Sequence, residues 1–305
     1  MPFGLKTPGA RKMDALNAAS QVAETSHGTV EFALRGDAPY VLIFHGTPQG
    51  HHASFMGEPI EAAGFGTITP SRPGYLRTPL KTGRTFAEQA DAAAALLDEL
   101  GVDQVAAYGV SGGGPSSIQF AARHPDRIKC LILEVAISQR YEPELSALTV
   151  ALAMNPLAFW IQGQLLRRAP RIAVGQMVKM ESTLDSADRA RITADVIASP
   201  EKLDVLRRLV DGPSFGSLRA GFDNDMEQFA TIDRLPLEEV RCPALIVHGT
   251  DDGDVPYRHA EDAAQAIPGA ELFTVDKGWH LLRLSDGDDA YLQAEIEFLQ
   301  EHLSR

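Results

Sequence analysis

The chain has 305 residues, of which 44% are hydrophobic and 23% are charged, and its formal net charge is −13. This length allows a large core and a second small domain, and the composition is that of a globular protein. The acidic balance gives no electrostatic reason to bind nucleic acid or an anionic membrane. Arg167, Arg168 and Arg171 are close in the sequence, and we interpret them as a solvated helix face. A small molecule is the expected partner.

The two cysteines, Cys130 and Cys242, each begin an apolar run, which predicts buried or half-buried thiols. They provide neither a disulfide framework nor metal-ligand spacing. Residues 1–20 lack the continuous apolar region of a signal peptide. No window approaches the roughly 18 apolar residues of a membrane span. We expect a cytoplasmic protein, and the sequence does not specify its oligomeric state.

Short apolar runs alternate with helical patterns along much of the chain. Strands are predicted, in chain order, at Tyr40–Phe44, Thr67–Pro70, Val105–Val110, Ile128–Val135, Ala244–Val247 and Glu271–Val275. Helices are predicted from a capping box at Thr85 to Gly101, over 115–123 and over about 288–303. This alternation predicts an α/β fold with a mostly parallel, doubly wound sheet and helices on both faces.

The alternation stops between residues 138 and 233, where the pattern is helical and no strand is evident. Because this part lies between two predicted strands, we expect it to be an inserted helical cap. The predicted domains are therefore a core of residues 1–137 and 234–305 and a cap of residues 138–233. We interpret most methionine and aromatic side chains of the cap as packing residues, and we expect a minority to line the cavity beneath it.

Residues Gly109 to Gly113 have the pattern Gly-x-Ser-x-Gly. They follow the predicted strand Val105–Val110 and precede a predicted helix, which is the strand–turn–helix context of a nucleophile elbow. The serine of such an elbow, here Ser111, lies on a sharp turn that leaves room only for small neighbours. The sequence thus predicts Ser111 as a nucleophile at the carboxyl end of the sheet.

A serine hydroxyl needs a base within hydrogen-bonding reach, and the base needs an acid that orients it. Of the nine histidines, His280 is the best candidate base. It follows the predicted strand Glu271–Val275 by a short loop, and a doubly wound sheet places its site in such loops. The sequence therefore predicts His280 as the general base of Ser111.

The candidate acids lie in the loop after the predicted strand Ala244–Val247, which contains three aspartates. Asp252 is the preferred acid, and Glu134, at the end of another strand, is the alternative. Asp251 and Asp254 are interpreted as caps of the next helix or as solvent-facing side chains. The order serine, aspartate, histidine along the chain is that of the α/β hydrolases.

An acyl-transfer intermediate also needs hydrogen-bond donors for its oxyanion. The backbone N–H of Gly112, directly after the nucleophile, is one candidate, because it also lies at a helix N-terminus. The backbone N–H of Thr47, in the loop after the first predicted strand, is the other. The Thr47 hydroxyl, His51 and His52 could add donors, although exposure in the loop is the simpler interpretation of the two histidines.

These motifs together resemble the α/β-hydrolase superfamily, in its cap-bearing branch of esterases, lactonases, peptidases and C–C bond hydrolases. The likeness runs from about residue 28 to the end, through HGTP at 45–48, SRPGY at 71–75, GVSGG at 109–113, GTDDGDVP at 249–256 and GWH at 278–280. It implies the α/β-hydrolase fold, with catalytic roles for Ser111, Asp252 and His280. It also implies oxyanion roles for Thr47 and Gly112, and no cofactor or metal.

Three positions depart from the pattern of this family. The family often has aspartate where Ser71 stands, glycine where Leu76 stands and glycine where Trp279 stands, directly before the base. These changes remove no catalytic group, but they reshape the surroundings of the pocket. The serine at the elbow argues against the dehalogenases and epoxide hydrolases of this fold, which use aspartate there.

The resemblance implies a serine hydrolase that acts through an acyl-enzyme, and the apolar side chains of the predicted cap favour a small, largely apolar ester. Its activity is expected to fall below roughly pH 6.5, as the histidine base protonates. A cofactor-free C–C hydrolase, lactonase, aminopeptidase or perhydrolase would use the same elbow. A non-catalytic protein that holds a small ligand under the cap is a further alternative, because a fold does not fix a function.

Overall fold

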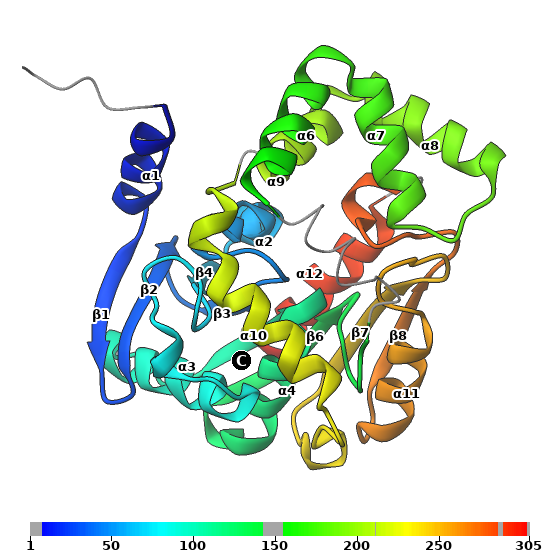
Figure 1. The fold of residues 1–305 in the computed structure, drawn as a ribbon. Coiled ribbons are helices and arrows are strands. Elements are labelled where there is room, and N and C mark those ends of the chain that lie inside the picture. The colour runs from blue at the N-terminus through cyan, green and yellow to red at the C-terminus, as the bar shows by residue number, and fades with distance from the viewer. Residues whose placement is uncertain (1–7, 143–154, 211, 286–288, 304–305) are drawn as a thin grey trace, which may run out of the picture.

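The computed structural model describes residues 8–142, 155–210, 212–285 and 289–303 of the chain. These residues form an eight-stranded sheet (Figure 1). Its strands are β1 (Gln21–Thr25), β2 (Gly28–Arg35), β3 (Tyr40–Phe44), β4 (Gly66–Pro70), β5 (Val105–Val110), β6 (Ile128–Glu134), β7 (Ala244–Gly249) and β8 (Glu271–Val275). Their spatial order is β1-β2-β4-β3-β5-β6-β7-β8. The strands from β3 to β8 run parallel, and β1 and β2 join one edge in antiparallel pairings.

All six predicted strands are present, with ends that differ from the prediction by at most two residues. The antiparallel strands β1 and β2 were not predicted. β1 is largely exposed and therefore lacks an apolar run. β2 contains the fully buried Glu31, which interrupts the apolar pattern. Arg77 Nε lies 2.6 Å from a carboxylate oxygen of Glu31, and this pairing compensates the buried charge.

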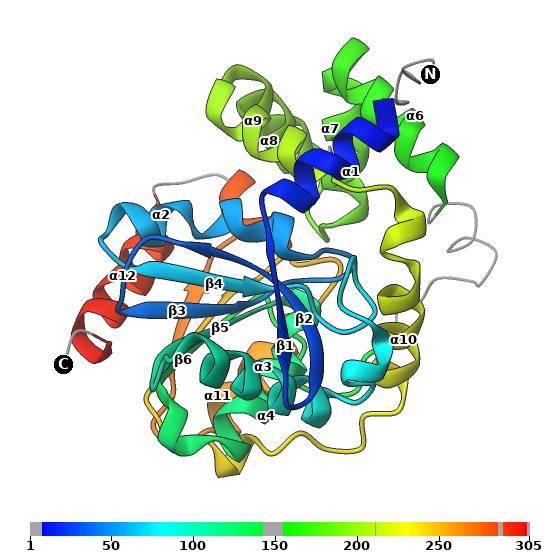
Figure 2. The same cartoon turned by 90° about the vertical axis from the view of Figure 1, so that its left-hand side faces the viewer.

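Helices cover both faces of the sheet (Figures 1 and 2). One face carries α3 (Phe86–Leu100), α4 (Gly114–Arg123) and α11 (Arg258–Ala266), and the other carries α2 (Glu58–Ala62) and α12 (Ala290–His302). Because successive strand residues point to opposite faces, Leu42 of β3 packs in the first apolar core and Val41 in the second. The predicted doubly wound α/β fold is thus confirmed.

Helix α3 shows how local sequence sets the ends of these helices. The Thr85 side chain accepts a hydrogen bond from the Glu88 backbone N–H, and Glu88 reaches back to the Thr85 N–H, so the predicted capping box is present. The helix ends at Gly101, whose φ of +65° is left-handed and is adopted by glycine at little cost.

The described residues between β6 and β7 form helices and no strand. These helices are α6 (Pro156–Arg168), α7 (Pro170–Met180), α8 (Ser186–Ala198), α9 (Pro200–Val210) and α10 (Arg219–Ala230). Helices α6 to α9 lie together at one end of the sheet (Figure 1) and share an apolar cluster of their own. Helix α10 instead packs Phe229 into the core that α3 and α4 cover. The predicted domain boundaries at residues 138 and 233 stay a prediction.

Candidate active site

Ser111 lies on a tight turn between β5 and α4, and its φ is +49°. Residues other than glycine rarely adopt this left-handed conformation. A Cβ on Gly109 would lie 2.0 Å from Ser117 Oγ. A Cβ on Gly113 would lie 2.0 Å from the carbonyl oxygen of Phe44. The turn therefore presents Ser111 as a nucleophile elbow does and excludes larger residues at both glycines.

The fold brings Ser111, Asp252 and His280 into one hydrogen-bonded chain. His280 Nε2 is 3.0 Å from Ser111 Oγ, and His280 Nδ1 is 2.8 Å from Asp252 Oδ2. The three residues follow the carboxyl ends of the parallel strands β5, β7 and β8, which meet at one edge of the sheet. Such a chain can pass the serine proton to the imidazole while the carboxylate orients the ring.

Asp252 is held rigidly by the loop around it. Its Oδ1 accepts hydrogen bonds from the backbone N–H groups of Asp254 at 2.9 Å and Val255 at 2.8 Å. Its Oδ2 faces His280 and also lies 3.3 Å from His248 Nε2. Only 3% of the residue is exposed. Because both oxygens are engaged, the carboxylate can present only one orientation to the imidazole.

The segment between β6 and β7, called the insertion below, contacts the loops of both Asp252 and His280. It does so through Glu181, which directly follows α7. The Glu181 carbonyl oxygen accepts the backbone N–H of Gly253 at 3.1 Å and that of His280 at 3.3 Å. The next residue, Ser182, forms an isolated β-bridge with Asp252. One short segment of the insertion thus joins the loop of the acid to the loop of the base.

The two residues predicted for the oxyanion hole lie side by side next to the nucleophile. A Cβ on Gly112 would lie 2.3 Å from Thr47 Oγ1, and a Cβ on Gly46 would lie 3.3 Å from Ser111 Cβ. The Thr47 hydroxyl, however, donates its hydrogen to Asp225 Oδ2 at 2.5 Å. The expectation that this hydroxyl could add an oxyanion donor is therefore wrong, and the backbone N–H groups of Thr47 and Gly112 stay the predicted donors.

Comparison with known proteins identifies the family. A sequence model of the α/β hydrolase fold matches residues 39–286. The chain belongs to the α/β-hydrolase fold family. The resemblance stated from its motifs is thereby confirmed, and the chain is an enzyme of this fold.

Individual α/β hydrolases match most of the chain. The solved structure of an α/β-hydrolase fold protein from Nakamurella multipartita is 37% identical, with a TM-score of 0.86, and covers 92% of this chain and 99% of its own. The uncharacterized hydrolase YcgS of Bacillus subtilis is 30% identical over 84% of this chain and 90% of its own. A pimeloyl-[acyl-carrier protein] methyl ester esterase of Aromatoleum aromaticum is 28% identical over 84% of this chain and 97% of its own.

The charges of this α/β hydrolase act strongly on its candidate base. Burial would raise the pKa of Asp252, but His280 and His248 lower it to about 2, so the carboxylate stays ionised. Burial would lower the pKa of His280, but the surrounding carboxylates, chiefly Asp252 and Asp254, raise it above its ordinary value. Burial also raises the pKa of the nearby Glu181 to about 7.

Asp254 lies beside the candidate base of this α/β hydrolase, a contact that the sequence did not indicate. Its Oδ2 lies 3.4 Å from His280 Nε2, the nitrogen that also faces Ser111. Tyr141 holds it by donating its hydroxyl hydrogen to Asp254 Oδ1 at 2.5 Å. The Asp254 side chain is 40% exposed, but it does not cap α11, which begins after Tyr257 without a side-chain cap. A second carboxylate therefore stands beside the base.

Neutralising Asp254 is expected to shift the pH dependence of turnover. A base must be unprotonated to accept the serine proton, and the raised pKa of His280 places the acid limb above the pH 6.5 expected for an ordinary histidine. Asp254→Asn removes a negative charge that favours the protonated imidazole, so it should move the acid limb of kcat/KM to lower pH. We expect a shift of only about 0.5 to 1 unit, because solvent screens this partly exposed charge. The exposed Asp276→Asn, in the same loop as the base, is the charge-matched control. An unmoved acid limb in Asp254→Asn would contradict this role.

The alternative acid, Glu134, contacts a different group in the α/β hydrolase. It receives a hydrogen bond from the Tyr108 hydroxyl, which also lies 2.8 Å from Glu295 Oε1. A tyrosine hydroxyl carries one hydrogen, so it can donate to only one of the two carboxyl groups, and the other contact needs a carboxyl hydrogen. Burial raises the pKa of both Glu134 and Glu295. The core beneath α12 therefore holds a protonated carboxyl group.

Replacing Glu295 by glutamine should stabilise the α/β hydrolase increasingly as the pH rises. A carboxyl group whose pKa is raised by folding keeps its proton in the folded state, so its stabilising effect is lost as the pH rises from about 4.5 through the raised pKa. Glutamine has no proton to lose, and its amide can donate to the tyrosine. Above pH 8 we expect a gain of about 1 kcal/mol or more, measured by thermal unfolding between pH 5 and 9. Glu301→Gln, on the exposed end of the same helix, should give no pH-dependent gain, and an equal gain in both variants would refute the explanation.

The interpretation of His51 as an exposed loop residue is wrong. The residue is only 2% exposed. Its backbone N–H donates to Ser71 Oγ at 3.0 Å, and its ring Nε2 lies 3.2 Å from the Leu16 carbonyl oxygen on α1 (Pro8–Ala18). Its Nδ1 lies 3.5 Å from Glu31. His51 and Ser71, a position where the family often has aspartate, thus belong to one buried network around Glu31. Glu31 lies on β2, a strand that was not predicted from the sequence.

Trp279, which stands where this family usually has glycine, connects the base to the insertion. It is fully buried and belongs to the apolar cluster that α6 to α9 share, with Val178 and Leu206 among its members. The tryptophan is adjacent to His280 in the chain. Packing of the insertion therefore bears directly on the residue that precedes the base.

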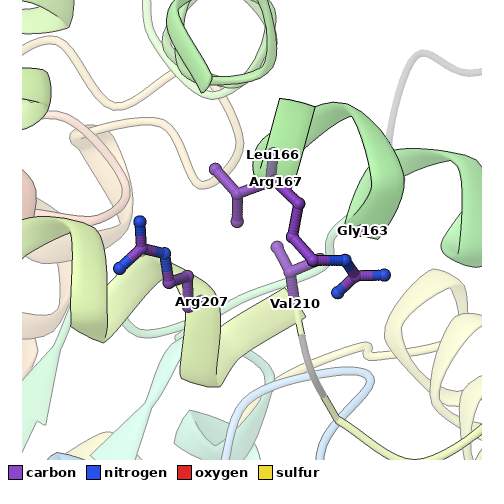
Figure 3. A pocket seen from close by; sticks show the side chains of 5 residues that line it. All are labelled: Gly163, Leu166, Arg167, Arg207 and Val210. Atoms are coloured by element: carbon purple, nitrogen blue, oxygen red, sulfur yellow. The ribbon is translucent and has the colours of Figure 1, made fainter. Parts of the chain in front are cut away.

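A cavity of about 270 Å³ lies between α6 and α9. Figure 3 shows the side chains that line it, which are Gly163, Leu166, Arg167, Arg207 and Val210. None of the three triad residues lines this cavity, so it belongs to the insertion.

Among the described residues, no helix is long and apolar enough to cross a membrane. The same part of the chain contains no group of three or more histidine, cysteine, aspartate or glutamate side chains placed to hold a metal ion.

Proposed function

We propose that this α/β hydrolase cleaves a small, largely apolar carboxylic ester, with Ser111 as nucleophile, His280 as general base and Asp252 as the acid that orients it. The observation that carries the proposal is the position of His280 between the other two groups, 3.0 Å from the hydroxyl and 2.8 Å from the carboxylate. The similarity to a methyl ester esterase over most of both chains supports an ester as the substrate.

The first half of the reaction forms an acyl-enzyme. Ser111 Oγ attacks the carbonyl carbon while its proton passes to His280 Nε2, and the carbonyl π electrons move to the oxygen. The N–H groups of Gly112 and Thr47 stabilise this oxyanion. When the tetrahedral intermediate collapses, the bond to the alcohol oxygen breaks, and His280 returns the proton to the departing alkoxide.

The second half releases the acid. His280 takes a proton from water as the water oxygen attacks the acyl carbon, and a second oxyanion forms in the same hole. Collapse then breaks the bond to Ser111 Oγ, which recovers its proton from His280. Asp252 keeps its charge throughout and stabilises the imidazolium in both halves.

The helices between β6 and β7 are proposed to act as the cap over this site, with the boundaries 138 and 233 expected from the sequence. Four observations on the insertion support a link to the triad: the hydrogen bonds from Gly253 and His280 to Glu181, the bridge at Ser182, and the burial of Trp279 in the cluster of the insertion. A cap in this position would select the substrate by the shape of its apolar group.

The test is hydrolysis of p-nitrophenyl esters from acetyl to dodecanoyl, with and without prior treatment by a fluorophosphonate. We expect turnover that fluorophosphonate abolishes, one covalent label that peptide mapping places on Ser111, and a preferred acyl length that sizes the pocket. Labelling without ester turnover would overturn the ester substrate but keep the serine hydrolase, and the search would move to lactones, peptides and C–C substrates. No labelling of the folded protein would overturn the proposed nucleophile.

A further inference from the structure

The Thr47 hydroxyl is tied to a buried ion pair in this structure. It donates to Asp225 Oδ2 at 2.5 Å and accepts a hydrogen bond from Arg72 Nη2 at 2.9 Å. A threonine hydroxyl has one hydrogen and two lone pairs, and here it is anchored through both roles. The loop that carries the candidate oxyanion donor is thus held through the side chain of Thr47.

The ion pair itself has nearly ideal geometry and is shielded from water. Arg72 donates from Nη1 to Asp225 Oδ1 at 3.0 Å and from Nη2 to Asp225 Oδ2 at 2.6 Å. The Tyr75 hydroxyl donates to Asp225 Oδ2 at 2.6 Å. The side chains of Arg72 and Asp225 are 1% and 0% exposed. A bidentate pair with additional donors holds its geometry tightly, since removal of any member leaves a buried charge unsatisfied.

Arg72 also holds the residue two positions before Thr47. Its Nε donates to the His45 carbonyl oxygen at 3.0 Å, and its backbone N–H donates to His45 Nε2 at 2.9 Å. The guanidinium therefore fixes two points of the loop that follows β3. A loop pinned at both points has little freedom to shift the backbone N–H of Thr47.

Asp225 reaches this loop from α10, which lies in the insertion. Phe229, one turn further along the same helix, lies against the second candidate donor, because a Cβ on Gly112 would be 3.0 Å from Phe229 Cζ and 2.3 Å from Thr47 Oγ1. Helix α10 is itself docked on the loop after β4, where the Gly221 N–H donates to the Gly74 carbonyl oxygen at 2.9 Å. Helix α10 therefore contacts both residues that carry the candidate oxyanion donors, Thr47 through Asp225 and Gly112 through Phe229.

We propose that Asp225, with Arg72, is a positioning residue for the oxyanion hole: from helix α10 it anchors the Thr47 hydroxyl and so places the Thr47 N–H opposite the Gly112 N–H. This inference rests on the proposed function, because it assigns a position to groups that act on an oxyanion. Asp225 does not touch the reacting atoms and acts through Thr47.

The energetic reason lies in the precision that an oxyanion hole requires. Donors stabilise the transition state only when they sit within hydrogen-bonding distance of the place where charge develops. Removing one donor costs roughly 100- to 1000-fold in kcat, and displacing a reacting group by about 1 Å can cost 100-fold. A loosened Thr47 loop should therefore lower kcat while substrate binding, which does not use the developing charge, changes little.

The sharpest test is Thr47→Val, which keeps the branched shape and the backbone N–H but removes the hydroxyl link to Asp225. We expect kcat on the best p-nitrophenyl ester to fall by roughly 10- to 100-fold, with KM changed by less than about two-fold and the pH of the acid limb unchanged. Thr47→Ser restores the hydroxyl and should recover most of the lost turnover. Glu227→Gln, which breaks only an exposed pair between α10 and Arg84, should leave kcat at the wild-type value.

Two further measurements separate positioning from a general loss of structure. Asp225→Asn should lower kcat at least as much as Thr47→Val, and the double variant should lose no more than Asp225→Asn alone, because both changes break one link. Affinity for an aryl trifluoromethyl ketone, whose adduct with Ser111 carries an oxyanion, should fall by the same factor as kcat/KM across the series. If Asp225→Asn does not fold, Thr47→Val and Thr47→Ser still decide the question.

The outcomes distinguish this inference from the proposed function. A wild-type protein without ester turnover or fluorophosphonate labelling would remove the proposed function, and the inference with it. An active wild type whose Thr47→Val variant keeps its kcat would overturn the inference alone. An effect of Thr47→Val on KM with kcat intact would also overturn it, since the hydroxyl would then serve binding.

Discussion

Ser111→Ala is expected to lower kcat for ester hydrolysis by about 10⁴-fold or more without unfolding the protein. The substitution removes the hydroxyl oxygen that lies 3.0 Å from His280 Nε2, so no acyl-enzyme can form. Losing one member of a serine triad costs a similar factor in enzymes of this kind. Alanine keeps the Cβ at the tight turn, and its backbone strain at φ of +49° is close to that of serine. The melting temperature should therefore stay within a few degrees of the wild type.

The measurement is kcat by release of p-nitrophenol, together with fluorophosphonate labelling, for the variant and the wild type. His280→Gln should lose about as much, and the double variant little more, because the two residues act as a unit. Ser186→Ala, at the exposed start of α8, is the matched control and should keep full activity. Turnover in Ser111→Ala close to the wild-type value would show that the reaction does not pass through this serine.

Gly113→Ala is expected to destabilise the protein by more than about 4 kcal/mol, or to prevent folding. The new Cβ would lie 2.0 Å from the Phe44 carbonyl oxygen and 2.6 Å from the Phe44 carbonyl carbon. Neither atom can move easily, because Phe44 ends β3, a central strand with parallel neighbours on both sides. Overpacking against fixed backbone has no rotamer that relieves it. The second glycine of the elbow is thus required by the fold before any chemistry is considered.

The yield of folded protein and the midpoint of thermal unfolding measure this effect. Gly175→Ala is the control, because a Cβ at that position on α7 would find its nearest neighbour, Thr193, at 3.8 Å. Replacing a helical glycine by alanine in open space should stabilise by up to about 1 kcal/mol. A Gly113→Ala variant as stable as the wild type would mean that the strand and the elbow are less tightly packed than described.

The sequence predicted the parts of this molecule that local pattern encodes. The parallel strands β3, β5, β6 and β7 are apolar runs buried on both faces. The elbow lies between a strand and a helix, so Ser111 could be recognised without its partners. His280 could be found because the carboxyl ends of parallel strands meet at one edge. Asp252 needed the resemblance as well, since three aspartates share its loop and only the fold shows which one contacts Nδ1 of the imidazole.

The rest depended on partners that lie far apart in the chain. A buried charge hides a strand from pattern analysis, and Glu31 hid β2 because its partner Arg77 is 46 residues away. Asp225 looked like any polar residue of a helix, since the arginine it meets is 153 residues away. The contact of Asp254 with His280 was missed for the same reason, because His280 and Tyr141 come from other parts of the chain. Long-range pairing of charges was the information that the linear pattern did not contain.

The carbonyl oxygen of Glu181 limits how this enzyme can be recombined with its relatives. It accepts hydrogen bonds from the backbone amides of Gly253 and His280 at once, so it ties the loop of Asp252 to the loop of His280. A chimera that takes its insertion from another protein must bring an extended segment that offers a carbonyl at the same point. Crossovers that preserve residues 181–183 should therefore give active hybrids far more often than crossovers that replace them, because this short segment is bonded to the loops of Asp252 and His280.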